Sequence, residues 1–251
     1  MSWFSPKIVR PVIPALLSVL LGSASGVVAA NRVADTKFSR DRGFYDSPIT
    51  VSITTKTAGA RIVYTTDGSA PHPESGLSYS SPLVLSNTTV LRAAAFKAGW
   101  EPSNADTQTY LFPAQIVAQT GAGFPATWGL NDGQPVRADY EMDPEVTQHP
   151  AYRGEMIPAL KSLPTLSVVM ARPDLFDPAR GIYANPKESG SSWERPASVE
   201  LLFPDGRPGF QIDGGIRIQG GWNRRPEESP KHSFRLVFKK TYGPGKLKHP
   251  L

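Results

Sequence analysis

The chain has 251 residues, with 25 prolines, 22 glycines and no cysteine, and it carries a formal net charge of +5. This abundance of proline and glycine favours many turns and short strands over a helix bundle. The absence of cysteine excludes a disulfide scaffold, a zinc or iron–sulfur site with cysteine ligands, and a cysteine nucleophile.

The first 30 residues have the three-part pattern of a secretory signal peptide. A short basic segment ends at Arg10, residues 12–21 are almost wholly apolar, and Val28-Ala29-Ala30 fits the small-residue cleavage pattern. An uncleaved anchor is the alternative, but the apolar stretch is shorter than the roughly 20 residues that span a bilayer as a helix. We expect a secreted or extracytoplasmic bacterial protein, with no membrane span after cleavage.

Residues 31–37 are interpreted as a linker, and residues 38–112 as a small antiparallel β-sandwich. Ile49, Val51 and Ile53 alternate with polar residues, which is the period of a half-buried strand. Further strands are predicted at residues 60–66, 82–85, 89–96 and 107–112. Short strands separated by regular turns are typical of a sandwich.

Three residues of this region are candidates for chemistry. Asp67 could be a catalytic carboxylate, but the Gly68 that follows it favours a turn. A retaining glycosidase also needs a second carboxylate close by, and the sequence nominates none. Tyr79 and Trp100 could stack on a sugar ring, or they could pack against the sandwich.

The motifs of this region resemble a known family. They are VYTTDGSAP at residues 63–71, YSSP at 79–82 and LRAAAFKAG at 91–99. The pattern is similar to that of the chitobiase/β-hexosaminidase C-terminal-type domain, an immunoglobulin-like β-sandwich often appended to glycoside hydrolases. The resemblance implies an accessory role as a spacer or an adhesive module, without catalysis.

Residues 113–162 are interpreted as a connecting region. Its acidic stretch at residues 139–145 could bind calcium, although the regular calcium-loop motif is absent. Alternatively, Asp143 caps a helix that starts at Pro144. A short helix is predicted at residues 155–162, with Pro158 in its first turn.

Residues 163–251 are predicted to begin a second β-rich (α+β) domain, which we expect to be incomplete. Strands are expected at residues 165–170, 197–203, 210–213, 215–219 and 232–239, with a turn at 173–176 and an extended piece at 181–185. The glycines of residues 214–221 suggest either a phosphate-cradling loop or glycines that bracket a strand. The basic residues near the C-terminal end could meet phosphates, or they could protect a solvated strand edge.

This region resembles the N-terminal part of the CotH kinase family. The matching pieces follow in order: LPTLSVVM at 163–170, GIYAN at 181–185, WERPASVEL at 193–201, GIRIQGG at 215–221 and PKHSFRLVF at 230–238. The resemblance implies a kinase-like fold that uses ATP and magnesium. It also implies that the family's metal-binding and catalytic residues would follow Leu251, so we assign no catalytic or metal-binding residue in this chain.

One set of cofactor contacts follows from this resemblance. Lys231 stands where the family has a lysine, and kinase-like folds use a lysine on an early strand to hold nucleotide phosphates. Arg224, Arg225 and Arg235 are weaker phosphate candidates, and an ordinary surface lysine is the alternative for Lys231.

The sequence therefore favours a fragment of an exported bacterial multidomain protein with a non-catalytic sandwich, whose full-length parent resembles a CotH-like ATP-dependent phosphotransferase. The alternative is a cell-surface, carbohydrate-binding or structural protein without enzymatic activity. The expected partners are cell-surface polysaccharide or protein, and no nucleic acid. The oligomeric state is open.

Overall fold

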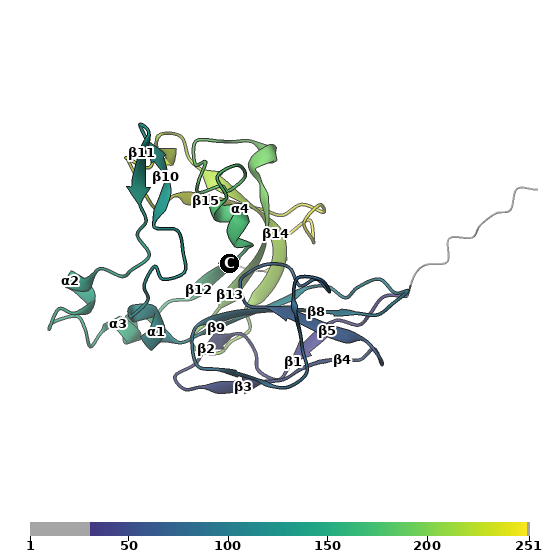
Figure 1. Cartoon of the computed structure of the whole chain (residues 1–251). Helices are drawn as coiled ribbons and strands as arrows, with labels where there is room; N and C mark the ends of the chain where they lie inside the picture. The colour runs from purple at the N-terminus through teal and green to yellow at the C-terminus, as the bar shows by residue number, and fades with distance from the viewer. Residues whose placement is uncertain (1–30, 250–251) are drawn as a thin grey trace, which may run out of the picture. The chain divides into compact units, whose positions relative to one another are not determined.

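The computed structural model describes residues 31–249, which are mainly β (Figure 1). The predicted signal peptide at residues 1–30 lies outside the described residues. Among residues 31–249, no helix has both the length and the apolar character needed to cross a membrane.

The first group of strands forms the predicted sandwich. A five-stranded sheet has the order β2-β9-β8-β5-β6, and two strand pairs, β1-β4 and β3-β7, complete the group. All strand pairs are antiparallel except β2 and β9, which run parallel and depart from the predicted pattern. The strands are β1 (Thr36–Phe38), β2 (Gly43–Phe44), β3 (Ile49–Val51), β4 (Ile53–Thr55), β5 (Arg61–Thr65), β6 (Leu77–Ser78), β7 (Leu83–Leu85), β8 (Thr89–Phe96) and β9 (Asp106–Leu111).

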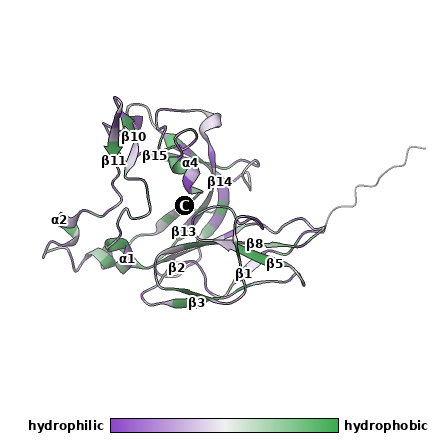
Figure 2. Cartoon of the chain, viewed as in Figure 1, coloured by the Kyte–Doolittle hydropathy of each residue, from purple (hydrophilic) through white to green (hydrophobic). Residues whose placement is uncertain are grey.

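The predicted strand around Ile49 divides at Ser52 into β3 and β4. β3 pairs with β7, whereas β4 pairs with β1, so one alternating run serves two sheets. Val51 and Ile53 are both buried in the core of the sandwich, together with Leu91 and Tyr110. Figure 2 shows the hydrophobic segments of β3 and β5 that contribute to this core.

Residues 31–37 pack on the sandwich. Val33 is 2% exposed, and its backbone N–H donates to the carbonyl of Glu101. Thr36 begins β1 and is paired with Thr55. The sandwich therefore begins before residue 38, because these residues supply an outer strand.

The connecting region is partly ordered into short elements. They are α1 (Pro113–Val117), a hairpin of β10 (Thr127–Asn131) and β11 (Gln134–Arg137), α2 (Pro144–Thr147) and α3 (Met156–Leu160). Asp143 Oδ1 accepts a hydrogen bond from the Glu145 N–H at 2.8 Å, which confirms the predicted cap of α2. α3 confirms the helix predicted at residues 155–162.

The second group of strands forms one antiparallel sheet in the order β12-β13-β14-β15. Its strands are β12 (Thr165–Val169), β13 (Arg195–Leu202), β14 (Phe210–Gln219) and β15 (Ser233–Val237), and shorter elements connect them: α4 (Arg172–Phe176), η1 (Ser191–Trp193) and η2 (Trp222–Arg224).

Two local predictions in this region were wrong. The expected turn at residues 173–176 belongs to α4, because Pro173 lies in the first turn of a helix, where it costs no hydrogen bond. Residues 181–185 form successive turns instead of an extended piece. The Asn185 side-chain amide holds them by donating to the carbonyls of Pro178 and Gly181.

The two strands predicted at residues 210–219 are one continuous strand, β14. Gly214 and Gly215 lie in its middle, and a Cβ at Gly215 would stand 2.5 Å from the ring of Tyr242. The glycines therefore leave room for an aromatic side chain to lie on the strand. The alternative in which the glycines of residues 214–221 bracket a strand is therefore right only at the C-terminal side, where Gly220 and Gly221 follow the end of β14.

Candidate functional site

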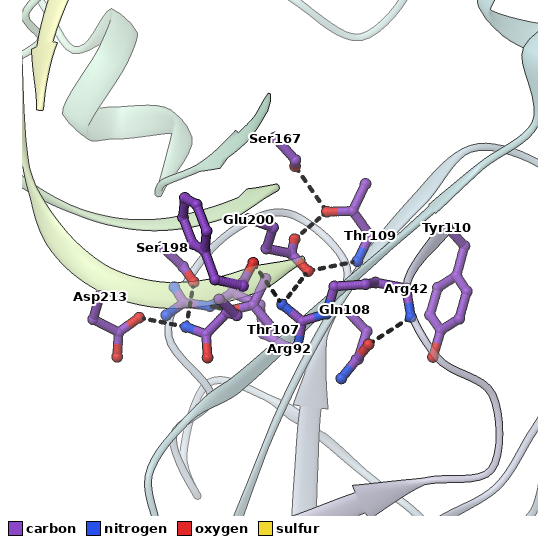
Figure 3. Close-up of polar contacts among 12 residues, drawn as sticks. Arg42, Arg92, Thr107, Gln108, Thr109, Tyr110, Ser167, Ser198, Glu200 and Asp213 are labelled. Atoms are coloured by element: carbon purple, nitrogen blue, oxygen red, sulfur yellow. Dashed lines mark hydrogen bonds and ion pairs between the residues drawn. The ribbon is translucent and has the colours of Figure 1, made fainter. Parts of the chain in front are cut away.

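A buried polar network joins the sandwich to the second sheet (Figure 3). We call this network the junction. Glu200, in the middle of β13, is 0% exposed. Its Oε1 lies 3.1 Å from Arg42 Nη1 and accepts the backbone N–H of Thr109 at 3.2 Å. Thr109 Oγ1 donates to Glu200 Oε2 and lies 2.8 Å from Ser167 Oγ. One carboxylate of the second sheet is therefore held by a cation and two donors from the sandwich.

Strand alternation explains why this side chain faces the sandwich. Glu200 lies opposite Gln211 in β14, and Ser198 lies opposite Asp213, so these four polar residues share one face of the sheet. Gln211 Nε2 donates to Ser198 Oγ at 2.8 Å and to Asp213 Oδ1 at 3.0 Å. The other face of the same strands carries Ala197 and Ile216 in an apolar core.

A second cation comes from the sandwich. Arg92, on β8, donates from Nε to Thr107 Oγ1 at 3.2 Å and from Nη1 to the Gly68 carbonyl at 3.0 Å. Burial lowers the pKa of Arg92, while the charges of Asp213 and Glu200 act in the opposite direction. Arg92 thus adds a second positive charge beside the acids of the second sheet.

The turn that begins at Asp67 is part of the same junction. Asp67 Oδ1 accepts hydrogen bonds from the backbone N–H and the hydroxyl of Ser69, as a turn residue does. Gly68 has φ +83°, and a Cβ there would stand 2.4 Å from the carbonyl oxygen of Met170. The turn therefore lies against the backbone at the end of β12.

Burial raises the pKa of Glu200, with the charge of Arg42 and the Thr109 hydrogen bonds opposing it. Burial likewise raises the pKa of Asp213, opposed by Arg92. Protein donors engage both oxygens of Glu200, and its side chain has no contact with solvent. The arrangement is suited to holding two surfaces together.

The pKa direction of Glu200 predicts an unusual pH dependence of stability. The unfolded carboxyl ionises near its ordinary value of 4.5, whereas the folded one keeps its proton to a higher pH. The contribution of Glu200 to the free energy of unfolding is therefore fully present below pH 4.5 and is lost as the pH rises through the pKa of the folded state. Relative to wild type, Glu200→Gln should gain stability as the pH rises, in urea unfolding from about pH 3 to 8.

Glu194 provides a control with the opposite sign. Its hydrogen bond from Lys239 lowers its pKa, and Tyr242 and Arg217 act in the same direction. The contribution of Glu194 to the free energy of unfolding is present above pH 4.5 and is lost as the pH falls through the pKa of the folded state. Glu194→Gln should therefore differ most from wild type at neutral pH and approach it in acid. If the two variants showed the same pH trend, the assignment with the opposite sign would be contradicted.

A groove of about 540 Å³ lies beside this junction. Arg42, Tyr45 and Gln108 line it from the sandwich, and residues 203–204 and 206–209 line it from the loop between β13 and β14. Arg207 lies over the Phe203 ring at 3.9 Å and also pairs with Asp205. Asp41 also lines the groove, which therefore carries charges of both signs.

The predicted phosphate contacts have separate partners. Lys231 Nζ lies 2.8 Å from Asp139 Oδ2, with both side chains more than half exposed. Arg224 donates to four backbone carbonyls, those of Pro186, Glu188, Ile218 and Gly220.

The guanidinium of Arg225 lies 3.8 Å from the centre of the Trp222 ring, and Arg235 lies opposite Arg217 in the sheet. Of these cations, Lys231 has its charge at the surface with a single carboxylate partner, and phosphate binding by it stays a prediction. No group of three acids or histidines that could hold a metal ion occurs among residues 31–249.

The two predicted sugar-stacking residues lie in different surroundings. Tyr79 is half-buried against the sandwich core, with its ring edge-on to Tyr64 at 6.5 Å. Trp100 lines a groove of about 360 Å³ with Arg61 and Lys97, and Lys97 Nζ lies 4.6 Å from the centre of its ring. Trp100 is the one of the two that borders a groove.

The junction residues were not recognised from the sequence. Arg42 lies outside the predicted strands, whereas Thr109 and Glu200 lie inside those predicted at residues 107–112 and 197–203. The one available signal was an acid inside the apolar run of residues 197–203, since an acid is rarely buried without a partner.

A comparison with models of known protein families finds a match in the sandwich. Residues 41–109 match the model of the chitobiase/beta-hexosaminidase C-terminal domain, which confirms the resemblance found in the motifs of this region. The matched segment covers just over a quarter of the chain and includes Arg42, Gly68, Arg92 and Thr109. No curated protein and no solved structure matches the chain.

Proposed function

We propose that residues 41–109 are a non-catalytic accessory module that holds the sheet β12–β15 in a fixed position within an exported bacterial multidomain protein. The observation that supports this role is the sharing of the buried Glu200 carboxylate by Arg42 and Thr109. A buried charge that loses its partner is costly, so the two parts gain stability from staying docked.

A distance measurement between the two parts tests the docking. The chain has no cysteine, so spin labels can be placed at Val84→Cys and Leu163→Cys, two exposed positions on the sandwich and next to β12. Docking predicts one narrow distance distribution, as wide as that of the reference pair Val84→Cys and Lys56→Cys within the sandwich. A broad or multiple distribution would overturn the proposed role.

The second region is proposed to belong to a CotH-like phosphotransferase that uses ATP and magnesium in the full-length parent. The support is the order of the motifs in residues 163–238 and the surface position of Lys231. The test is to read the gene beyond the codon for Leu251 and to measure magnesium-dependent ATP binding by the protein that the whole frame encodes. A stop codon at that point would end this part of the proposal.

The alternative function is binding of cell-surface polysaccharide without catalysis. The groove around Trp100 supports it, because an aromatic ring with neighbouring cations and prolines offers a surface for a sugar. Binding to insoluble polysaccharides that is lost in Trp100→Ala but retained in Trp222→Ala would favour this alternative. If Trp100→Ala and Trp222→Ala bind the polysaccharide equally well, the result would count against this alternative.

A further inference from the structure

The groove beside Trp100 combines apolar rings with positive charge. Its volume is about 360 Å³, which falls within the roughly 300–1,000 Å³ of small-molecule sites. Trp100, Phe96 and two prolines form its apolar walls, and its charged residues are Arg61 and Lys97. Among the described residues, no acid lines the groove. Because a cleft lined by charges of one sign attracts ligands of the other sign, this groove favours an anion.

Strand pairing and a turn bring these residues together. Arg61 begins β5 and is paired with Phe96, the last residue of β8. The chain then turns back, and the N–H of Trp100 donates to the carbonyl of Lys97 at 3.1 Å. The groove is therefore built on the ends of two paired strands and on the turn that follows them.

Both cations of the groove are held by backbone carbonyls. Arg61 Nη2 donates to the Pro73 carbonyl at 2.6 Å, and Lys97 Nζ donates to the Ala58 carbonyl at 2.9 Å. Within residues 31–249, neither cation has a carboxylate oxygen within 4.0 Å. A neutral carbonyl fixes the position of a cation without cancelling its charge. The two positive charges are therefore positioned and available to a ligand.

The charge of Lys97 lies next to the aromatic wall. Its Nζ is 4.6 Å from the centre of the Trp100 ring, at a distance where the ring attracts a cation. The acids nearest in the sequence, Glu74 and Glu101, are exposed and do not line the groove. A ligand carboxylate that binds Lys97 would therefore lie beside the indole ring, with no acid of the wall to repel it.

We propose that this groove binds an acidic polysaccharide whose sugar rings carry carboxylates. This inference rests on the polysaccharide-binding alternative proposed above, and it adds the class of sugar. The sugar ring packs against Trp100 and Phe96, and its carboxylate accepts hydrogen bonds from Arg61 and Lys97. Hydrogen bonds between ionised partners are stronger than neutral ones, and the guanidinium fork matches the geometry of a carboxylate.

A labelled galacturonate oligomer is the probe, and fluorescence anisotropy of the label measures its binding to the full chain. The methyl-esterified oligomer keeps the sugar rings but loses the charges, so it should bind about tenfold more weakly. Added salt should weaken the binding of the acidic oligomer and leave that of the ester nearly unchanged. This comparison uses the unaltered protein, so it does not depend on the folding of a variant.

Two double variants separate the groove from the overall charge. Arg61→Gln with Lys97→Gln should weaken galacturonate binding about tenfold or more. Arg153→Gln with Lys240→Gln removes the same charge at two exposed positions elsewhere, and should leave the binding unchanged. An equal loss of binding in the two double variants would overturn the site, because only the net charge would matter.

The selectivity and the broader polysaccharide function can fail separately. Equal affinity for galacturonate and its methyl ester would overturn the preference for acidic sugars, even where Trp100→Ala abolishes both. Failure to bind galacturonate while insoluble polysaccharides still bind through Trp100 would overturn this inference and leave the alternative function in place. Failure of the soluble oligomers and of the insoluble polysaccharides to bind would overturn both.

Discussion

Arg42→Ala should lower the free energy of unfolding by about 3–5 kcal/mol at neutral pH. The reason is the position of Glu200, which is 0% exposed and would lose the nearest cation that offsets the cost of its burial. The loss should shrink in acid, because a protonated Glu200 no longer needs the arginine. Urea unfolding of the full chain at two pH values measures both effects.

Two further variants serve as controls for Arg42→Ala. Arg207→Ala removes an arginine whose partner, Asp205, is exposed, and it should cost at most about 1 kcal/mol. The double variant Arg42→Met with Glu200→Leu should recover much of the loss, since an apolar pair can replace a buried ion pair. A loss below 1 kcal/mol in Arg42→Ala would mean that the pair does not secure the junction.

Gly68→Ala should destabilise the protein by about 2–5 kcal/mol, from two separate causes. The backbone at Gly68 is left-handed, with φ +83°, which disfavours any side chain. In addition, the new methyl group would stand 2.4 Å from the Met170 carbonyl oxygen, a backbone atom that cannot rotate away. The turn would therefore have to move off the end of β12.

Gly59→Ala is the control for the first cause, the left-handed backbone. The difference between the two variants therefore measures the second cause, the contact with Met170. Gly59 is also left-handed, with φ +73°, but a Cβ there meets nothing within 4 Å. It should cost only about 1–2 kcal/mol. Hydrogen exchange should also quicken near residues 68 and 170 in Gly68→Ala but not in Gly59→Ala. Equal effects of the two substitutions would show that the contact with Met170 contributes nothing.

Much of the fold follows from local patterns in the sequence. Alternation and turn residues predicted most strands of the sandwich and most of those in the second sheet, and Asp143 with Pro144 predicted the start of α2. The errors arose where local signals were ambiguous. Gly214 is predicted to separate two strands, although it lies within β14, and the rings of Phe238 and Tyr242 occupy the space beside Gly214 and Gly215.

The junction could not be predicted in the same way. Thr109 and Glu200 are 91 residues apart in the sequence, and no periodicity within either segment shows that they meet. Both faces of β13 are buried, so alternation alone does not say which face meets the sandwich. Long-range pairing of this kind is set by tertiary packing, and the sequence offered only the hint of an acid among apolar residues.

The distribution of the junction residues restricts how this sandwich can be exchanged between proteins. The family match covers Arg42, Gly68, Arg92 and Thr109, whereas Glu200 and Asp213 belong to the second sheet. In a chimera that carries a related sandwich domain without an arginine at the position of Arg42, Glu200 would lack its ion-pair partner. Recombination at the domain boundary would therefore need compensating changes in β13, so the two parts are expected to be inherited together.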